Sequence, residues 1–147
     1  MSEKLLDIKD LTIQYVTESE TVSAVNGLDI ELNEGETIGL VGETGAGKTT
    51  SALGIMGLVP NPPGKVIRGS IKFFGKDLLK ETEEGMRKIR GSQISMIFQD
   101  PMTSLNPVMT VGEQIAEVID IHEQIGPTAA LEKAKDMLEL VGIPGAR

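Results

Sequence analysis

Apolar and polar residues alternate in two stretches near the N-terminus. Residues 5–15 (LLDIKDLTIQY) and 25–32 (VNGLDIEL) place apolar side chains at about every second position. Successive side chains of a strand point to opposite faces, so this period is typical of a strand with one buried and one solvated face. The pattern predicts two half-buried strands, and residues 16–23 between them are expected to form a loop.

Two other segments are apolar without alternation. Residues 37–41 (TIGLV) form a short, nearly unbroken apolar run, and residues 93–98 (QISMIF) form a second one. Such runs are typical of strands covered on both faces, as in a parallel sheet. We therefore expect buried strands at both places, and a further strand at residues 69–74 (GSIKFF).

Helical signals lie between and after these segments. Residues 49–58 are expected to form a helix that ends before the proline-rich residues 59–64, which cannot continue it. A short charged helix is expected at residues 82–90. Strands mixed with helices in this order predict an α/β fold.

The last forty residues predict a pair of helices. Thr110 and Glu113 have the spacing of a capping box, which predicts a helix from there to about His122. Apolar residues recur at near-helical spacing from Thr128 onward, and Gly142 is a suitable residue just past the end of that helix.

Composition narrows the function classes. The chain has 147 residues, no Cys and one His, which excludes disulfides, thiol catalysis and a multi-histidine metal site. With 14 Lys and Arg against 22 Asp and Glu, the net charge is −8, so a polyanion must bind through a local device. Aromatic residues make up 3% of the chain, which further disfavours nucleic-acid binding. We expect no membrane span and no secretory leader, because no apolar run is long enough.

A glycine-rich segment between the expected strand 37–41 and the expected helix 49–58 carries the main chemical signal. It matches the pattern G-x-x-x-x-G-K-[ST] at every defined position, with Gly42, Glu43, Thr44, Gly45, Ala46, Gly47, Lys48 and Thr49. Glycines let the backbone N–H groups point inward at the positive end of a helix, where an anion such as a triphosphate binds.

The residue types in this loop fit a nucleotide with Mg²⁺. Lys48 supplies a positive charge for the β and γ phosphates, the Thr49 hydroxyl can ligate Mg²⁺, and Thr50 can hydrogen-bond a nearer phosphate. The loop alone does not decide which nucleotide binds, or whether its phosphate is transferred to water, to a metabolite or not at all.

Longer blocks of sequence make the chain recognisable. The block TIGLVGETGAGKTT, followed about fifty residues later by ISMIFQDPMTSLNPVMTVGEQI, resembles the ATP-binding subunits of ABC transporters. The segments FQDPMTSLNP, IMGL and VGIP are similar to the branch that serves dipeptide, oligopeptide and nickel importers. The resemblance covers essentially the whole chain.

The resemblance implies roles for residues outside the loop. Gln99 matches the glutamine that contacts Mg²⁺ and the attacking water, so Lys48 and Gln99 are the expected catalytic residues. Tyr15 stands where the family places an aromatic residue that stacks on adenine, and Glu43 is expected to line the mouth of the site. The alternatives are a strand-end glutamine bonded to backbone and a tyrosine that packs at a sheet edge.

Two further parts of the sequence invite comparison with the family's partner surface and its switch histidine. Residues 102–108 would lie near the surface that such subunits present to their membrane partner, although Met102, Leu105 and Met109 fit helix packing equally well. His122 is interpreted as a solvated residue beside Asp120, and not as the family's switch histidine.

Some of the family's hydrolytic elements do not occur in the sequence. No apolar run that ends in Asp-Glu follows Gln99, and no LSGGQ-type signature is present. We interpret the chain as an N-terminal fragment and expect it to bind ATP without turning it over alone. Because the strand before the loop is expected to lack a neighbour, we also expect the fragment to self-associate.

The combined prediction is an incomplete P-loop core of the α/β class, with a small N-terminal antiparallel β portion and the start of a helical subdomain. Its expected divisions are residues 1–98 and 99–147. The resemblance implies that ATP and Mg²⁺ are bound at the cytoplasmic face of a membrane, for import of peptides or a related solute. It implies membrane subunits and a second ATP-binding subunit as partners, and a solute-binding protein indirectly.

Of three other functions for a P-loop chain, the sequence disfavours two and leaves one open. A soluble P-loop kinase would carry its loop nearer the N-terminus than residue 42, and a GTPase would need an [NT]-K-x-D element, which does not occur. A non-catalytic nucleotide-binding or regulatory module fits the same loop. The solute itself, whether dipeptide, oligopeptide, nickel or glutathione, is not specified by these residues.

Overall fold

A computed structural model describes residues 4–100 and 104–143 of the chain. The chain divides into two compact units, Met1–Arg87 and Lys88–Arg147, and each is described by itself. The division predicted after residue 98 followed from motifs and not from compactness, and it stays a prediction.

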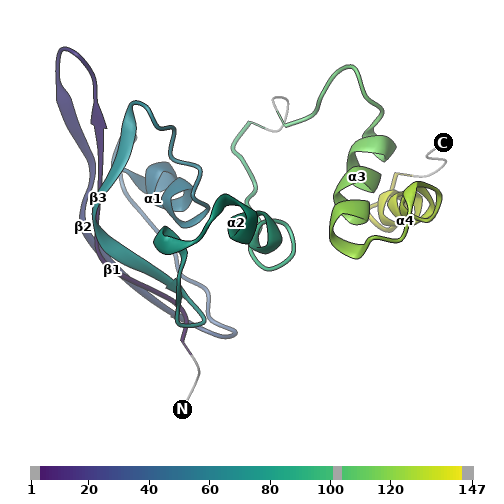
Figure 1. The fold of residues 1–147 in the computed structure, drawn as a ribbon, viewed down its shortest axis with the longest axis horizontal. Coiled ribbons are helices and arrows are strands. Elements are labelled where there is room, and N and C mark those ends of the chain that lie inside the picture. Colours follow the sequence, from purple (N-terminus) through teal and green to yellow (C-terminus); the bar gives the residue numbers. More distant parts are fainter. Residues whose placement is uncertain (1–3, 101–103, 144–147) are drawn as a thin grey trace. The chain divides into compact units, whose positions relative to one another are not determined.

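An antiparallel sheet dominates the first unit (Figure 1). Its strands are β1 (Lys4–Val16), β2 (Thr21–Asn33), β3 (Gly64–Phe73) and β4 (Lys76–Asp77), in the order β2-β1-β3-β4. The two half-buried strands expected from alternation are confirmed. The loop expected between them is shorter than predicted, because the backbone N–H of Thr17 donates to the carbonyl of Glu20 at 2.9 Å and closes a tight turn.

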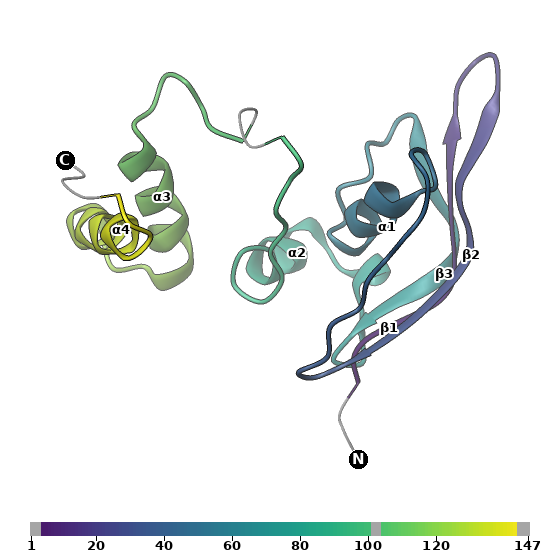
Figure 2. The same cartoon turned by 180° about the vertical axis from the view of Figure 1, so that it is seen from behind.

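Helix α1 (Lys48–Ile55) packs on one face of this sheet (Figure 2). The fully buried side chains of the unit are all strand residues, namely Ile8, Leu11, Ile13 and Ile71. Gly54 of α1 brings the helix close to them, since a Cβ at this position would lie 2.9 Å from Cδ1 of Ile13. The apolar alternation of the sequence therefore forms the contact surface between sheet and helix.

The two unbroken apolar runs do not form the expected strands. Residues 37–41 have no regular structure, and Val41 is 94% exposed. Residues 93–98 contribute only an isolated bridge between Arg90 and Ile94, and Ile97 is 98% exposed. A strand of a parallel sheet needs neighbouring strands to pair its backbone and helices to cover its faces, and the described residues provide neither at these two places.

Other boundaries differ from the prediction for local reasons. Helix α1 ends at Ile55, before the predicted residue 58, because Gly57 adopts a positive φ of 63° that no helix residue can have. Strand β3 begins at Gly64, where the proline-rich connection ends. A 3₁₀ turn η1 (Leu78–Lys80) follows β4, and helix α2 (Glu83–Ile89) confirms the charged helix expected at residues 82–90.

Two packed helices form the described core of the second unit. Helix α3 (Val111–Glu123) begins with the predicted capping box: the Glu113 N–H donates to the Thr110 hydroxyl, and the Thr110 N–H donates to the Glu113 carboxylate at 2.8 Å. Helix α4 (Pro127–Leu140) packs against it through small and branched residues, and Ala116, Ile119, Ala130 and Ala134 are buried there. Gly142 has a φ of 84°, which confirms it as the residue past the helix end.

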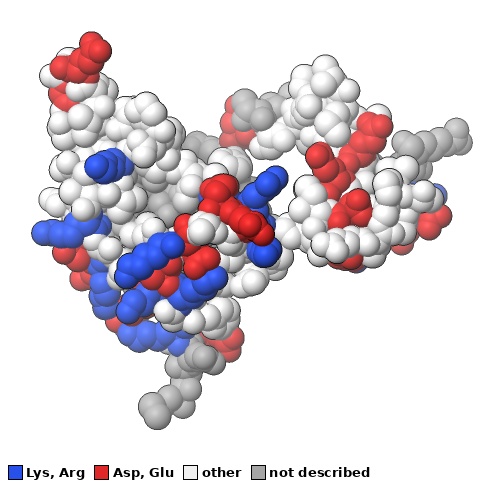
Figure 3. Space-filling model, viewed as in Figure 1, with Lys and Arg blue, Asp and Glu red and all other residues white. Residues whose placement is uncertain are grey.

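Within the described residues, no helix combines the length and the apolar character needed to cross a bilayer. The surface of the first unit carries charges of both signs. Figure 3 shows Lys and Arg interspersed with Asp and Glu over this unit. Lys4 and Lys9 both pair there with Glu31, at 2.9 and 2.6 Å.

Candidate nucleotide-binding site

The glycine-rich loop wraps the N-terminus of α1. Gly45 and Gly47 have φ angles of 85° and 81°, which only glycine adopts without strain. Between them, the Ala46 N–H donates to the Glu43 carbonyl at 3.1 Å and tightens the turn. Gly47 is the N-cap of α1, and no side chain in the described part of the chain caps this helix. The positive end of α1 is therefore left for a ligand.

Gly47 also holds the loop against the sheet. A Cβ at Gly47 would overlap the carbonyl oxygen of Ala24 in β2 and would lie 3.4 Å from Cγ2 of Val25. The loop backbone thus rests directly on the backbone of β2. Sequence reasoning did not single out Ala24, because a contact between distant residues leaves no local pattern.

The Lys48 ammonium lies inside the loop. Its Nζ donates to the carbonyl oxygens of Gly42 and Glu43 at 2.5 and 2.7 Å. Lys48 is half-buried, whereas Glu43 is exposed, and its expected place at the mouth of the site stays a prediction. The loop and the lysine predicted to act together are therefore in contact.

The first turn of α1 carries the two threonines. Thr49 is exposed and Thr50 is half-buried, and the first turn contains no acidic residue that would repel an anion. The Ser51 hydroxyl donates to the Gly47 carbonyl at 2.9 Å, which ties the helix to its own N-cap. Ser51 was not predicted as a site residue, although the sequence shows a hydroxyl residue directly after the two threonines of the loop.

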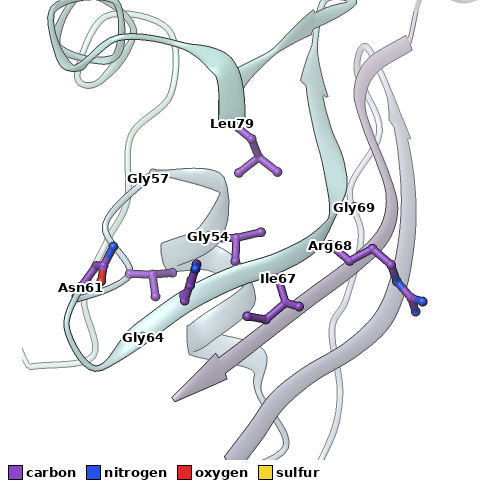
Figure 4. Close-up of a pocket in the computed structure, with 11 residues that line it drawn as sticks. Gly54, Gly57, Asn61, Gly64, Ile67, Arg68, Gly69 and Leu79 are labelled. Carbon is purple, nitrogen blue, oxygen red and sulfur yellow. The ribbon is translucent and has the colours of Figure 1, made fainter. Parts of the chain in front are cut away.

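A cavity of about 480 Å³ lies beside the loop. One wall is the β2 segment 23–29, and the other includes Gly45, Ala46, Lys48 and Ser51. A second cavity of about 450 Å³ lies between α1, the connection that follows it and β3 (Figure 4). It is lined largely by glycine and apolar residues, and the Arg68 guanidinium points away from it. The cavity beside the loop contains Lys48 in its lining and lies at the N-terminus of α1.

Tyr15 lies at the far end of β1. It pairs with Val22 of β2 on one side and Gly64 of β3 on the other. The ring is half-buried, and a Cβ at Gly64 would lie 2.8 Å from its Cε1. The neighbouring Val16 N–H donates to the Pro63 carbonyl at 2.9 Å, so the strand end that carries the ring is fixed on both sides.

Gln99 belongs to the second unit. It is exposed, on a bend that follows the irregular segment 93–98. The structure brings together the loop residues Gly42 to Thr50, and Tyr15 belongs to the same unit, whereas Gln99 belongs to the other. Met102 lies outside the described residues. His122 is half-buried against Gly91, and not solvated as interpreted from the sequence.

Comparison with known proteins identifies the family. The family profile described as ABC transporter matches residues 25–147. The chain is 51% identical over 141 residues to the oligopeptide transport ATP-binding protein OppD of Bacillus subtilis, covering 96% of this chain and 39% of that protein. It is 46% identical over 142 residues to the oligopeptide transport ATP-binding protein AppD of the same organism, covering 97% of this chain and 43% of that protein.

The fold agrees with this assignment. The dimeric structure of a bacterial ABC transporter cassette matches with a TM-score of 0.77 at 21% identity, over 92% of this chain and 56% of that one. The chain spans about two-fifths of the length of the two curated relatives, 39% and 43%. On the profile and these relatives, the chain belongs to the ABC transporter family of ATP-binding proteins.

Proposed function

We propose that this chain is part of an ATP-binding subunit of an ABC transporter that imports peptides, and that ATP binds at the loop Gly42–Thr50. The observation that carries the proposal is the N-terminus of α1, which has no side-chain cap and holds the Lys48 ammonium beside it. The names of the relatives, oligopeptide transport ATP-binding proteins, support peptides as the solute.

In this proposal, each part of the site binds a different part of ATP. The loop N–H groups and the positive end of α1 hold the phosphates, and Lys48 turns from the two carbonyl oxygens to the β and γ phosphates. Thr50 hydrogen-bonds a nearer phosphate. Tyr15 stacks on the adenine at the end of β1, which favours a purine over a free triphosphate.

The donor atoms fit Mg²⁺ as the accompanying ion. The described residues hold no group of three or more His, Cys, Asp or Glu that could cage a metal. Mg²⁺ bound with a nucleotide needs few protein ligands, since phosphate and water oxygens supply most of its shell. The Thr49 hydroxyl and the Gln99 amide oxygen are both hard oxygen donors, and they are the residues we assign to it. When bound, Mg²⁺ neutralises charge on the transferring phosphoryl group.

In the full-length protein we propose that hydrolysis of this ATP powers transport. Lys48 stabilises charge that develops on the γ phosphate, and Gln99 orients the attacking water through its amide without adding charge. The partners we propose are membrane subunits at the cytoplasmic face, a second ATP-binding subunit and, indirectly, a solute-binding protein.

Calorimetric titration of MgATP tests the binding step. Lys48→Ala should weaken MgATP binding at least about tenfold, because a charge-assisted contact worth about 1.5–3 kcal/mol is lost. Lys65→Ala is the matched control, since Lys65 is an exposed lysine on β3 of the same unit. Equal affinities of wild type and Lys48→Ala would contradict the proposed site.

Phosphate release by the full-length protein tests the enzyme. Turnover of ATP that is lost in Lys48→Ala and in Gln99→Ala supports the proposed ATPase. MgATP binding without any phosphate release would instead favour the non-catalytic regulatory module considered above.

A further inference from the structure

Three neighbouring strands of the sheet are irregular at the same level. The pairing of β1 with β2 shifts register between Ile8 and Leu11, and its pairing with β3 shifts between Lys9 and Thr12. Asp10 lies at the centre of both shifts, with a φ of 51°. An extra residue of this kind bends a strand and increases its local twist. The irregularity therefore involves three of the four strands and not one alone.

Polar contacts hold this bend from both sides. On the β3 side, Arg68 binds the Asp10 carboxylate with two nitrogens, Nη2 to Oδ1 at 2.8 Å and Nε to Oδ2 at 2.7 Å. On the β2 side, the Asp10 N–H donates to Oδ1 of Asp29 at 2.7 Å. Thr12, which is buried, accepts the N–H of Gly27 at 3.1 Å. One residue of β1 is thus tied to both neighbouring strands.

Two glycines make this arrangement possible. Gly27 of β2 and Gly69 of β3 have φ angles of 65° and 106°. A Cβ at Gly69 would lie 2.6 Å from the Asp10 carbonyl oxygen, so β3 approaches the bend as closely as a backbone can. The bend is therefore built by residues of all three strands.

Beyond the bend, the β1–β2 hairpin carries two groups of the candidate site. Tyr15 lies near its tip and pairs with Val22. Ala24 lies on β2 between the tip and the bend, with its carbonyl against Gly47 of the phosphate loop. Because Tyr15 and Ala24 are on paired strands, the register of the hairpin sets how far the ring lies from the phosphate loop. This register is set at the bend and at two further shifts between Leu11 and Gln14.

We propose that Asp10 and Arg68 are positioning residues that fix the span between Tyr15 and the phosphate loop, and thereby favour adenine nucleotides over free polyphosphate. The inference rests on the proposed function. Neither side chain is assigned a contact with the nucleotide: Arg68 points away from the second cavity, toward Asp10 on the neighbouring strand. Their effect passes through the register of β1 and β2.

The sheet offers a matched ion pair for comparison. Lys9 and Glu31 join β1 to β2, whereas Asp10 and Arg68 join β1 to β3. The Nζ of Lys9 and the Oε1 of Glu31 are 2.6 Å apart, and these two side chains are 50% and 46% exposed. Arg68 and Asp10 are exposed to a similar degree, 63% and 53%. Exposed ion pairs contribute little by themselves. The difference lies in the backbone: the Asp10 pair holds a residue of positive φ, and the Lys9 pair does not.

The experiment measures binding of two probes, MgATP and inorganic tripolyphosphate with Mg²⁺, to the full-length protein. The variants are Arg68→Gln, Asp10→Asn as a second test at a residue type that tolerates positive φ, and Glu31→Gln as the control. Each is also made in a Tyr15→Ala background. Thermal unfolding of every variant checks that it is folded.

We expect Arg68→Gln to weaken MgATP about three- to tenfold and to leave tripolyphosphate unchanged. Asp10→Asn should act in the same direction and less strongly, since its amide keeps one oxygen for Arg68. Glu31→Gln should change neither ligand. In the Tyr15→Ala background, Arg68→Gln should have no further effect, because the ring it positions is gone.

Three results would overturn the inference. Equal loss of both ligands in Arg68→Gln would mean that the pair only stabilises the unit, and an additive effect with Tyr15→Ala would mean that it acts elsewhere. An unchanged MgATP affinity in Arg68→Gln and Asp10→Asn would remove the role altogether, while the proposed function stands. If the wild type binds neither ligand, the proposed function fails first.

Discussion

The antiparallel sheet and the apolar segments 37–41 and 93–98 both contain many apolar residues, and they differ in how their backbones are paired. In the sheet, β1 lies between β2 and β3, so its N–H and C=O groups find partners on both sides. Residues 37–41 have no strand partner in the described chain, and Val41 is 94% exposed. Apolar content alone does not make a strand, because unpaired backbone groups must stay in contact with water.

The distance along the chain to a pairing partner explains the contrast. Strand β1 meets β2 across a turn of a few residues, which costs little loop-closure entropy. Strands of a parallel sheet require crossover connections, and they gain stability only when neighbours and covering helices are in place. The strands of the antiparallel sheet thus find their partners within the first unit, whereas residues 37–41 and 93–98 find no strand partner among the described residues.

Hydrogen exchange would show the contrast most strongly. Amides of β1 should exchange roughly a thousandfold or more slowly than those of residues 38–41, because opening the sheet requires unfolding of the unit. The measurement is native-state exchange followed by NMR or mass spectrometry on the chain of 147 residues. Comparable rates in both regions would show that the apolar segment is paired in solution, as self-association through that segment predicts.

Truncation of buried and exposed isoleucines sharpens the same comparison. Ile71 is fully buried in β3, so Ile71→Ala should lower the free energy of unfolding by about 2–5 kcal/mol. Ile97 is 98% exposed, and Ile97→Ala should change it by less than about 0.5 kcal/mol. Urea unfolding followed by circular dichroism measures both. A large loss for Ile97→Ala would mean that residues 93–98 are buried in this chain after all.

The capping box of α3 tests a region whose signals are local in the same way. Thr110→Ala removes the acceptor for the Glu113 N–H and should cost about 1 kcal/mol in the second unit. Thr110→Ser keeps the hydroxyl and is the control. The helical circular-dichroism signal during thermal unfolding reports the difference, and equal midpoints for both variants would contradict the role of the cap.

The smallest expected effect is at the charged face of the sheet. The hydrogen bond from Lys9, together with Lys4, lowers the pKa of Glu31 from 4.5 to about 2. The carboxylate therefore contributes to stability above about pH 4.5, and this contribution is lost as the pH falls toward 2. NMR titration of Glu31 in wild type and Lys9→Gln measures it. A Glu31 pKa that does not rise in Lys9→Gln would exclude this pair as the cause.

The elements that could be predicted are those whose signals lie within one segment. The alternation of residues 5–15 predicted β1, and Thr110 with Glu113 predicted the start of α3. The prediction of a strand at residues 37–41 was wrong, because an unbroken apolar run forms a buried strand only where other segments pair with it and cover it. Helix α1 ends earlier than predicted because Gly57 has a positive φ. The sequence shows that a glycine is present there, but it does not show which backbone conformation that glycine adopts.

In the candidate site, too, the residues within one segment could be predicted and the contacts between distant segments could not. The loop pattern singled out Gly42 to Thr49, but it did not indicate that the Lys48 ammonium would bind the Gly42 and Glu43 carbonyl oxygens. It did not locate Ala24, which supports Gly47 from another strand, or the Asp10 and Arg68 pair. These residues are far apart in sequence, and their meeting depends on register. The roles of Tyr15 and Gln99 came from resemblance and stay predictions.

The two carbonyl oxygens that accept the Lys48 ammonium have a consequence for the thermodynamics of ligand entry. A nucleotide would not find a vacant cation; it would compete with acceptors that the loop already provides. Binding of the nucleotide is then an exchange of acceptors for the Lys48 ammonium. The number of hydrogen bonds that Nζ donates hardly changes, but neutral carbonyl oxygens are replaced by charged phosphate oxygens. The free energy gained in this exchange is Coulombic. Added salt should therefore weaken the affinity, while the heat of binding should change comparatively little.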